Sequence, residues 1–478
     1  MVSSPEIKLR FDTFYNIIDG SPVSAAETRH GINPATKQPN PNVPVASQQD
    51  LDNAVEAAQR AFKSWSQTTI EERRAALLAY ADAYKKFTSD FAHLLTMEQG
   101  KPIAFATAEA EAGYTWITEL AKLSLSDEVL IDDEERKVVT RYTPLGVVGA
   151  IVPWNFPIQL AVGKIAPAVL AGNTIIVKPS PFTPYCGLKL VELAQRFFPP
   201  GVVQALSGPD ELGPWMTSHP RIDKISFTGS TATGKRVMQS ASATLKRLTL
   251  ELGGNDPAIV CKSANIKDVA PKVATFAFFN SGQVCVAIKR IYVHESIYKE
   301  FRDAVVEYTK SIKVGNGLEE GNFLGPIQNS SQYDRVQGFF DDVQQKGMKI
   351  AFGGPPADSK GYFINPTIID RPRDDSRLVT EEQFGPVIPL LAWSNEEDVI
   401  ERANNTDMGL GASVWSSDLQ EANCIAKRLQ AGNVWINTHL DLNPMVPFGG
   451  HKQSGIGSEW GTAGLKSYCN IQTLHLKL

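Results

Sequence analysis

Between residues 145 and 252 the sequence alternates short Val- and Ile-rich runs with longer helical stretches, and this alternation limits the fold more than any other feature. The apolar runs are VVGAIV, NTIIVK, VVQALSG, DKISFTG and RLTLEL, and the stretches between them include PIQLAVGKIAPAVLAG and TGKRVMQSAS. Parallel strands need long crossover connections and are buried on both faces, so this pattern is typical of a parallel sheet covered by helices. The sequence therefore predicts an α/β fold with a nucleotide-binding kind of architecture.

A second α/β segment is predicted after residue 253. It begins with DPAIVC, continues through the helix-like KDVAPKVATFAFFN and ends near GNVWIN. Residues 47–87 have a helical pattern, in which Ser47 can cap one helix and Thr69 with Glu72 forms the capping box of the next. These N-terminal helices contain no pattern that indicates chemistry.

Two further stretches, residues 122–141 and 466–478, alternate apolar and polar side chains and are predicted to be strands. One interpretation is that they leave the body of the protein and pair with another subunit, since a partner would satisfy their open edges. An edge hairpin within the same chain fits the pattern equally well.

Composition excludes several classes of function. With 478 residues the chain is too long for a single ordinary core, and 42% apolar residues, 21% charged residues and a net charge of −5 describe a soluble globular protein. No basic stripe predicts a nucleic acid partner. No run approaches the ~18 apolar residues of a membrane span, and the N-terminus lacks a signal peptide, so we expect a cytoplasmic protein.

The five cysteines are odd in number and widely spaced, with neither CxxC pairs nor neighbouring histidines. Reduced thiols and no metal site are therefore expected. Cys285, in FFNSGQVCVAIKR, follows a predicted helix in a loop where a thiol can be accessible. It is either a buried packing residue or a nucleophile, and no histidine nearby in the sequence forms a papain-type pair with it.

Two other residues have settings that suit catalysis. Asn155, in AIVPWNFP, lies between two prolines that restrict the backbone, and a rigid amide can donate to a developing oxyanion. Glu251 ends an apolar strand beside two glycines, where poor solvation would raise the pKa of its carboxyl group toward the range of a general base. A structural Asn in a tight turn and an edge salt bridge are the alternative interpretations.

The loop FTGSTATGKRV follows a predicted strand and opens a helix, with Gly229 and Gly234 five residues apart. Glycines at such a loop allow a phosphate to approach the backbone and the positive end of the helix dipole. The loop is neither a full GxGxxG nor a Walker A motif, and a plain turn fits it as well.

These signals occur together with others in one order: PWNFP, VKPSPFTP, FTGSTATG, LELGGNDP, FNSGQVC, EEQFGPV and PFGGHKQSGIG. The set resembles the NAD(P)-dependent aldehyde dehydrogenase superfamily, from about residue 30 to residue 470. The resemblance implies an aldehyde-dehydrogenase-like α/β fold with a Rossmann-type cofactor domain, an α/β catalytic domain and a small β oligomerisation arm. The expected boundaries are residues 1–121 and 142–252 for the cofactor domain, 253–452 for the catalytic domain, and 122–141 with 453–478 for the bridging segments.

The resemblance also implies a role for each matching residue. Cys285 would be the nucleophile, Glu251 the general base and Asn155 the oxyanion donor, together with the backbone N–H of Cys285, while Glu459 would relay protons behind the base. Lys178 would contact the adenosine ribose of the cofactor, and Glu382 and Phe384 would hold the nicotinamide ribose and ring. The remaining expected cofactor contacts are Ile151, Pro153, Trp154, Ser180, Pro181, Gly208, Phe227, Gly229, Ser230, Leu252 and Gly253.

The implied reaction is oxidation of an aldehyde to a carboxylic acid with NAD, and with NADP also possible, in a homodimer or homotetramer. Cys285 would attack the carbonyl, hydride would pass to the cofactor, and water activated by Glu251 would hydrolyse the thioester. The rival hypothesis is a catalytically silent structural or binding protein on the same fold. Ester hydrolysis by the same cysteine would be a side activity.

Three departures from the family pattern refine the expected cofactor and substrate preference. Pro181 stands where NAD-preferring members commonly have Glu, so the 2′-phosphate of NADP meets no repelling charge. Gly163 stands where several relatives have a bulky aromatic residue, and this predicts a wider substrate tunnel that suits aromatic or medium-chain aldehydes. The loop NTHLDLNPMVPFGG, with His439, Leu440, Leu442 and Met445, is mainly apolar and contains no Arg for a substrate carboxylate.

Overall fold

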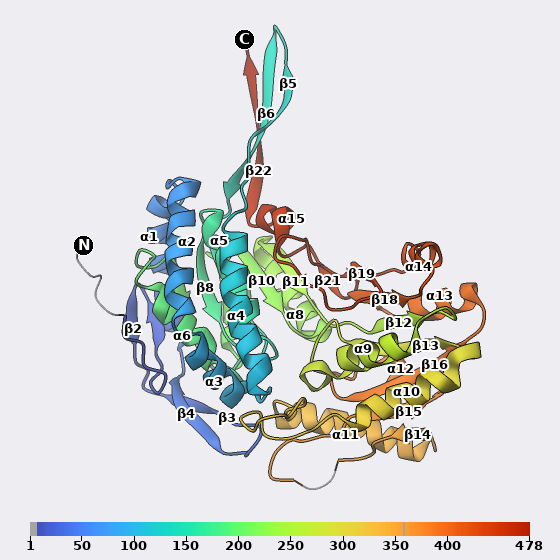
Figure 1. The fold of residues 1–478 in the computed structure, drawn as a ribbon. Coiled ribbons are helices and arrows are strands. Elements are labelled where there is room, and N and C mark those ends of the chain that lie inside the picture. The colour runs from blue at the N-terminus through green and yellow to red at the C-terminus, as the bar shows by residue number, and fades with distance from the viewer. Residues whose placement is uncertain (1–6, 357–358) are drawn as a thin grey trace.

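The computed structural model describes residues 7–356 and 359–478 (Figure 1). All five apolar runs predicted between residues 145 and 252 are strands of one eight-stranded sheet, in the order β2-β1-β9-β8-β7-β10-β11-β21. The five central strands, β9 to β11, are parallel, and β1 and β21 pair antiparallel at the two sides. The strand bounds are β1 Asn16–Ile18, β2 Ser21–Val23, β7 Val147–Ile151, β8 Thr174–Lys178, β9 Val203–Ala205, β10 Lys224–Thr228, β11 Arg247–Glu251 and β21 Gly455–Ile456.

Helices cover both faces of this sheet. One apolar cluster joins α2 to α6 with side chains such as Val148 and Ala150, and another joins α1, α7 and α8 with Val147 and Ile151. Successive residues of β7 thus enter opposite cores, as the strand period requires. The capping boxes at Ser47 and Thr69 are both formed. The helices are α1 Gln48–Trp65, α2 Ile70–Lys85, α3 Thr88–Gln99, α4 Ile103–Leu120, α5 Pro157–Leu170, α6 Tyr185–Ala194, α7 Leu212–Ser218, α8 Thr231–Ala241 and the short 3₁₀ turn η1 Ser242–Thr244.

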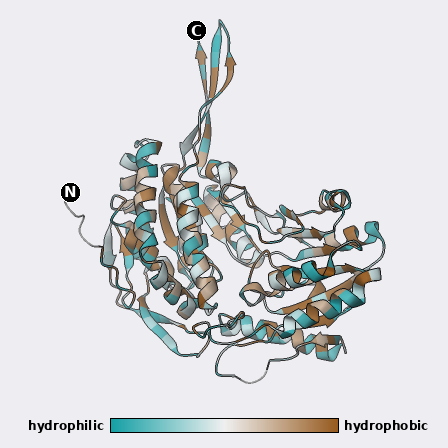
Figure 2. Cartoon of the chain, in the orientation of Figure 1, coloured by the Kyte–Doolittle hydropathy of each residue, from teal (hydrophilic) through white to brown (hydrophobic). Residues whose placement is uncertain are grey.

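The second predicted α/β segment forms a seven-stranded sheet in the order β14-β15-β16-β13-β12-β18-β19, in which only β14 is antiparallel. Its apolar strands are sandwiched between more polar helices (Figure 2). The strands are β12 Asp256–Val260, β13 Ile288–His294, β14 Lys349–Phe352, β15 Thr367–Asp370, β16 Val387–Trp393, β18 Gly411–Trp415 and β19 Asn433–Ile436. The helices are α9 Ile266–Phe278, η2 Phe279–Gly282, η3 Glu295–Ile297, α10 Tyr298–Lys310, α11 Ser330–Gln345, α12 Arg377–Thr380, α13 Glu396–Asn404 and α14 Leu419–Ala426. Two small ladders complete the body, β3 Thr28–Ile32 with β4 Pro39–Pro44, and β17 Met408–Gly409 with β20 His451–Lys452.

Three antiparallel strands form an arm that projects from the body of the protein (Figure 1). They are β5 Glu128–Asp132, β6 Arg136–Pro144 and β22 Cys469–Lys477, and β22 follows the short helix α15 Gly461–Lys466. Both stretches predicted as strands therefore form strands, and they pair with each other within the chain. β6 extends beyond residue 141, and β21, inside the 453–478 segment, pairs with β11 of the first sheet, while the domain boundaries themselves stay a prediction. In the described residues no helix is both long and apolar enough to cross a bilayer.

Asn173 joins the arm to the first sheet. Its buried side-chain oxygen accepts from Gly146 N at 2.9 Å, and its amide nitrogen donates to Ala168 O at 3.2 Å and to Tyr468 O at 2.9 Å. These bonds link the residues before β7, the end of α5 and the residue before β22.

We expect Asn173→Ala to lower the thermal midpoint by several degrees, because it leaves buried backbone groups without partners at a cost of about 2–4 kcal/mol. Differential scanning calorimetry would measure the shift. Asn423→Ala, on the exposed side of α14, is the matched control and should leave the midpoint unchanged. Equal midpoints for the two variants would contradict this role.

Candidate active site

The in-register pairing of the parallel strands collects functional residues at one edge of the first sheet. Ile151 is opposite Lys178 on β8 and opposite Phe227 on β10, and Thr228 is opposite Glu251 on β11. The strand order reverses at β7, since β8 and β9 extend to one side and β10 and β11 to the other. In open α/β sheets ligands bind outside the carboxyl ends of the strands at such a reversal.

Cys285 is presented by a tightly constrained loop between α9 and β13. Asn280, Ser281 and Gly282 have φ values of 51°, 57° and 73°, and a Cβ on Gly282 would lie 2.3 Å from Gly385 O. The Lys289 ammonium then donates to Val284 O at 2.8 Å and to Cys285 O at 2.6 Å. The backbone on both sides of the thiol is therefore fixed before any substrate binds.

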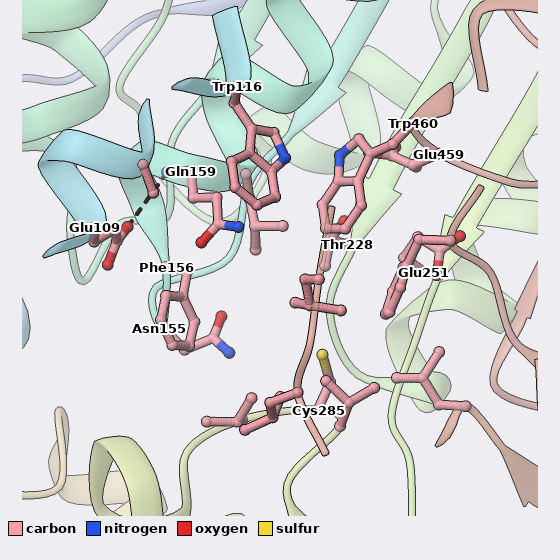
Figure 3. A pocket seen from close by; sticks show the side chains of 18 of the residues that line it. Glu109, Trp116, Asn155, Phe156, Gln159, Thr228, Glu251, Cys285, Glu459 and Trp460 are labelled. Carbon is pink, nitrogen blue, oxygen red and sulfur yellow. Dashed lines mark hydrogen bonds between the residues drawn. The ribbon is translucent and has the colours of Figure 1, made fainter. Parts of the chain in front are cut away.

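The structure brings Cys285, Asn155, Glu251 and Glu459 to one cavity of about 270 Å³. In Figure 3 the sulfur of Cys285 and the side-chain amide of Asn155 point into the same space, with Glu251 across from Asn155. The cavity is otherwise mainly apolar. Its other lining residues are Phe105, Ala108, Glu109, Ala112, Trp116, Phe156, Gln159, Leu160, Thr228, Leu252, Phe279, Val284, Val286, Leu410, Leu440, Leu442, Phe448 and Trp460.

Burial keeps the Cys285 thiol protonated in the free protein. Burial raises its pKa to about 12, Lys289 opposes the shift, and Glu382, Asp256 and Glu251 add to it. His439 does not serve as a partner base, because burial lowers its pKa to about 3 and its Nε2 lies 2.6 Å from Val286 O, which can only accept. A papain-type Cys and His pair is thus not formed.

Glu251 has the features of a general base. Burial raises the pKa of its carboxyl group well above the ordinary value, Glu459 adds to the rise, and Lys164 opposes it. Among the residues that the structure describes, neither carboxyl oxygen of Glu251 has a hydrogen-bond partner. Lys164 Nζ lies 2.6 Å from Glu459 Oε1 and 2.9 Å from Ser226 Oγ. These three residues form a buried polar cluster near Glu251.

Hydrogen bonds hold both the side chain and the backbone carbonyl of Asn155. Its side-chain nitrogen donates to Gln283 O at 3.1 Å, which leaves the second N–H of the amide for another acceptor. Its backbone carbonyl accepts from Lys101 Nζ at 3.0 Å. Lys101 forms a buried ion pair with Glu109, and Glu109 Oε1 accepts from Ile158 N at 3.0 Å at the start of α5.

Lys101, Glu109 and Lys164 were not predicted from the sequence as residues of the site. Glu109 is a charged residue on the buried face of a largely apolar helix, a pattern that signals an internal partner. Lys164 is likewise a lysine in the middle of the apolar helix α5. The partners themselves come from other segments and leave no mark in the local pattern.

The adenosine end of the expected cofactor site contains Lys178, Ser180, Pro181 and Gly208. Burial lowers the pKa of Lys178 to about 8, Asp210 opposes the shift and Arg29 adds to it. No hydrogen bond to the Lys178 ammonium is formed within residues 7–356 and 359–478, so this buried donor fits the hydroxyl groups of a ribose.

The loop after β10 contains Gly229 and Ser230. A Cβ on Gly229 would lie 2.5 Å from Cζ of Phe227, and Ser230 caps α8 by accepting from Thr233 N at 3.3 Å. Pro153 and Trp154 lie partly exposed on the turn between β7 and α5. These residues lie at the edge of the sheet where the strand order reverses, the usual place for a dinucleotide.

At the nicotinamide end of the expected cofactor site, Phe384 and Trp154 form an edge-to-face pair with ring centroids 5.3 Å apart. Glu382 Oε1 accepts from Gly254 N at 3.2 Å and lies 3.4 Å from Lys289 Nζ, while a Cβ on Gly253 would lie 2.4 Å from Glu382 Oε2. This glycine-lined approach beside a carboxylate fits the ribose and ring of a nicotinamide cofactor. Within the described ranges no group of three or more His, Cys, Asp or Glu residues could hold a metal ion.

The expectation that Gly163 widens the tunnel is wrong. Gly163 is buried and does not line the cavity, and a Cβ placed on it would lie 2.8 Å from Trp460 Nε1. The indole of Trp460 therefore occupies the space that a larger side chain at position 163 would fill. Trp460 is itself part of the cavity wall, so it supplies there the aromatic side chain that position 163 lacks.

The loop that was expected to be apolar meets the cavity only in part. Leu440 and Leu442 line it, whereas His439 is buried against Val286 and Met445 is 39% exposed on the surface. Its apolar character is retained at the two positions that reach the cavity. Among the described residues that line the cavity there is no Lys or Arg.

Comparison with known proteins agrees with this geometry. The profile of the aldehyde dehydrogenase family matches residues 23–474. Aldehyde dehydrogenase LUC3 of a Fusarium species is 44% identical over 468 residues, which cover 98% of this chain and 99% of that protein.

Two solved structures have nearly the same fold. Betaine aldehyde dehydrogenase of Staphylococcus aureus in complex with NAD+ has a TM-score of 0.94 and 33% identity, covering 96% of this chain and 94% of that one. An E. coli NADP-dependent enzyme has a TM-score of 0.95 and 32% identity, covering 98% and 99%. The chain therefore belongs to the aldehyde dehydrogenase family and is an NAD(P)-dependent aldehyde dehydrogenase.

Proposed function

We propose that this enzyme oxidises an apolar aldehyde, aromatic or of medium chain length, to the carboxylic acid through a thioester at Cys285. The observation that carries the proposal is the shared cavity: a thiol, an amide and a base from three distant segments face one mainly apolar space. Glu109, Glu251 and Glu459 are its acidic groups, and no Lys or Arg of the described ranges lines it, so aldehydes that carry a carboxylate are disfavoured.

In the first half of the reaction Cys285 attacks the carbonyl carbon. Of the three glutamates in the cavity, Glu251 alone has no partner on either oxygen within the described part of the chain, so it takes the thiol proton. The new C–S bond turns the carbonyl oxygen into an oxyanion, which the free N–H of Asn155 and the backbone N–H of Cys285 stabilise. When bound, NAD(P)+ supplies the hydride acceptor and a positive ring that favours the thiolate.

Glu251 first releases the thiol proton to solvent. In the second half it takes a proton from water, and the resulting hydroxide attacks the thioester carbon. The C–S bond breaks, the acid leaves, and the thiolate recovers its proton from Glu251. The Lys164 and Glu459 pair behind Glu251 is placed to pass the proton onward. Lys101 and Glu109 act indirectly, by fixing the backbone of Asn155.

Both coenzymes are proposed to serve. Lys178 provides a positive charge at neutral pH, and Pro181 brings no carboxylate against a 2′-phosphate. Asp210 is near enough to Lys178 to influence its pKa and can favour the ribose hydroxyls of NAD.

We also propose that the arm assembles the enzyme as a homodimer or homotetramer. It exposes large apolar side chains, with Val129 54%, Leu130 60%, Ile471 69% and Leu476 45% accessible. Such a surface on a projecting sheet is typical of a site covered by another subunit.

The thiol mechanism is tested with acetaldehyde, hexanal and benzaldehyde, each with NAD and NADP. We expect kcat/KM to be higher for hexanal and benzaldehyde than for acetaldehyde, and Cys285→Ala to abolish formation of the reduced cofactor with cofactor binding retained. Spectrophotometry at 340 nm and fluorescence titration measure the two quantities. Cofactor binding by the wild-type protein without oxidation of any aldehyde would favour the silent binding protein instead.

The role of Glu251 predicts a pH dependence. Its raised pKa keeps the carboxyl group protonated at low pH, so kcat should rise as pH increases through that pKa and the base becomes charged. Glu251→Gln should lower kcat by about 10²–10⁴-fold and remove this inflection. A variant whose pH profile of kcat matches the wild type would rule out Glu251 as the base.

The arm is tested by placing charges on its apolar surface. The double variant Ile471→Lys with Leu476→Lys should shift the mass measured by light scattering toward the monomer, because a lysine buried at an interface loses its hydration. Asn423→Lys, on the exposed side of α14 and outside the arm, should not. An unchanged mass for the double variant would place the interface elsewhere.

A further inference from the structure

A buried lysine on β13 contacts the backbone of the nucleophile and has no role in the reaction steps above. The side chain of Lys289 is 3% exposed, and it does not line the cavity. Its ammonium lies 2.8 Å from Val284 O, 2.6 Å from Cys285 O and 3.4 Å from Glu382 Oε1. An ammonium has three N–H groups, so it can serve these three oxygens at once.

The distances show that this ammonium is bound mainly to peptide carbonyls. Lys164 Nζ, for comparison, lies 2.6 Å from a carboxylate oxygen of Glu459, whereas Lys289 is closer to two carbonyl oxygens than to Glu382. A hydrogen bond from an ionised donor is roughly twice as strong as one between neutral groups. The two carbonyls are therefore held firmly in one orientation.

The carbonyl of Val284 belongs to the same peptide group as the N–H of Cys285. This peptide is trans and planar, so its C=O and its N–H point in opposite directions. Val284 and Cys285 both line the cavity and Lys289 does not. The oxygen that binds Lys289 is thus on the side away from the cavity, and the N–H is directed to the opposite side.

The N–H of Cys285 has no other acceptor. Within residues 7–356 and 359–478 no hydrogen bond from Cys285 N is formed. The second N–H of the Asn155 amide is also available, and Figure 3 shows this amide and the Cys285 sulfur pointing into the same space. Two donors are therefore left for an oxygen that develops charge beside the sulfur.

Lys289 also changes the strength of the backbone donor. Val284 O accepts from Lys289 Nζ and, at 3.1 Å, from Ala287 N, so both of its lone pairs are used. Hydrogen bonds in series polarise one another, by about 10–30% per bond. A carbonyl that is polarised by an ammonium leaves the N–H of its own peptide more positive.

We propose that Lys289 is a positioning residue of the reaction, which orients and polarises the Val284–Cys285 peptide so that the Cys285 N–H stabilises the oxyanion. The inference rests on the proposed function, since it assumes that Cys285 attacks a carbonyl in this cavity. Lys289 also acts on the thiol: burial raises the pKa of Cys285, and Lys289 opposes this shift. An experiment has to separate the oxyanion from the thiol.

Two reactions of the same thiolate make this separation. With 4-nitrophenyl acetate the C–S bond forms, the carbonyl oxygen becomes an oxyanion, and 4-nitrophenolate then leaves. With iodoacetamide the C–S bond forms as iodide leaves, and no oxyanion arises. Because both need the thiolate and neither needs the cofactor, the ratio of the two rates at one pH reports stabilisation of the oxyanion.

Lys289→Met removes the ammonium and keeps an unbranched side chain, while Ala287 N still binds Val284 O. We expect kcat/KM for the ester to fall about 10–100-fold more than the alkylation rate, below the roughly 10²–10³-fold that loss of a direct oxyanion donor costs. Lys289→Gln, which keeps an N–H donor, should show a smaller fall. Lys299→Met, at an exposed position on α10, is the matched control and should change neither rate.

Release of 4-nitrophenolate is followed by absorbance. Alkylation is followed by mass spectrometry of the Cys285 peptide, because Cys424 is exposed and also reacts. Equal losses in the two reactions of Lys289→Met would overturn the proposal, since Lys289 would then act on the thiol alone. Failure of both position-289 variants to fold and bind NAD would also overturn it, as Lys289 would be a structural residue.

Failure of the proposed function gives a different result. A wild-type protein that neither oxidises benzaldehyde with NAD nor hydrolyses the ester would contradict the proposed function and this inference together. A wild-type protein that does both, with Lys289→Met showing the wild-type ratio of ester hydrolysis to alkylation, would contradict only the role of Lys289.

Discussion

Parallel pairing in register is the constraint on which the rest of the site depends. Because β8, β7, β10 and β11 run in the same direction and are paired residue by residue, Lys178, Ile151, Phe227 and Glu251 reach the same edge of the sheet. A slip of one residue would turn these side chains to the opposite face. The proposed cofactor contacts and the proposed general base are therefore positioned by the same hydrogen-bonded ladder that forms the core.

Burial then determines the chemical state of the groups at that edge. It raises the pKa of Cys285 and of Glu251, so that the free enzyme holds a neutral thiol beside a carboxyl group ready to exchange protons. The cost of burying charge is offset by specific partners, Lys164 with Glu459 and Lys101 with Glu109. Both ion pairs lie next to catalytic groups and link segments that are distant in the sequence.

Much of the fold was predictable from local patterns. The five apolar runs, the capping boxes and the strands of the arm are all formed, because strand periodicity and helix caps are properties of a few neighbouring residues. The boundary near residue 453 was less predictable. The pairing of β21 with β11 depends on where the chain returns after the second sheet, which no short window of sequence contains.

The family, the order of the motifs and the candidates Cys285, Glu251 and Asn155 could be inferred without a structure, since each is marked by its immediate neighbours. The surroundings of these residues depend on how distant segments pack. Trp460 fills the space beside Gly163, His439 supports Val286 instead of serving as a base, and Lys101 reaches Asn155 from another helix. Packing and electrostatic fields act over a few ångströms of space, and residues within that distance come from distant segments, such as Lys164 and Glu459, which are 295 positions apart.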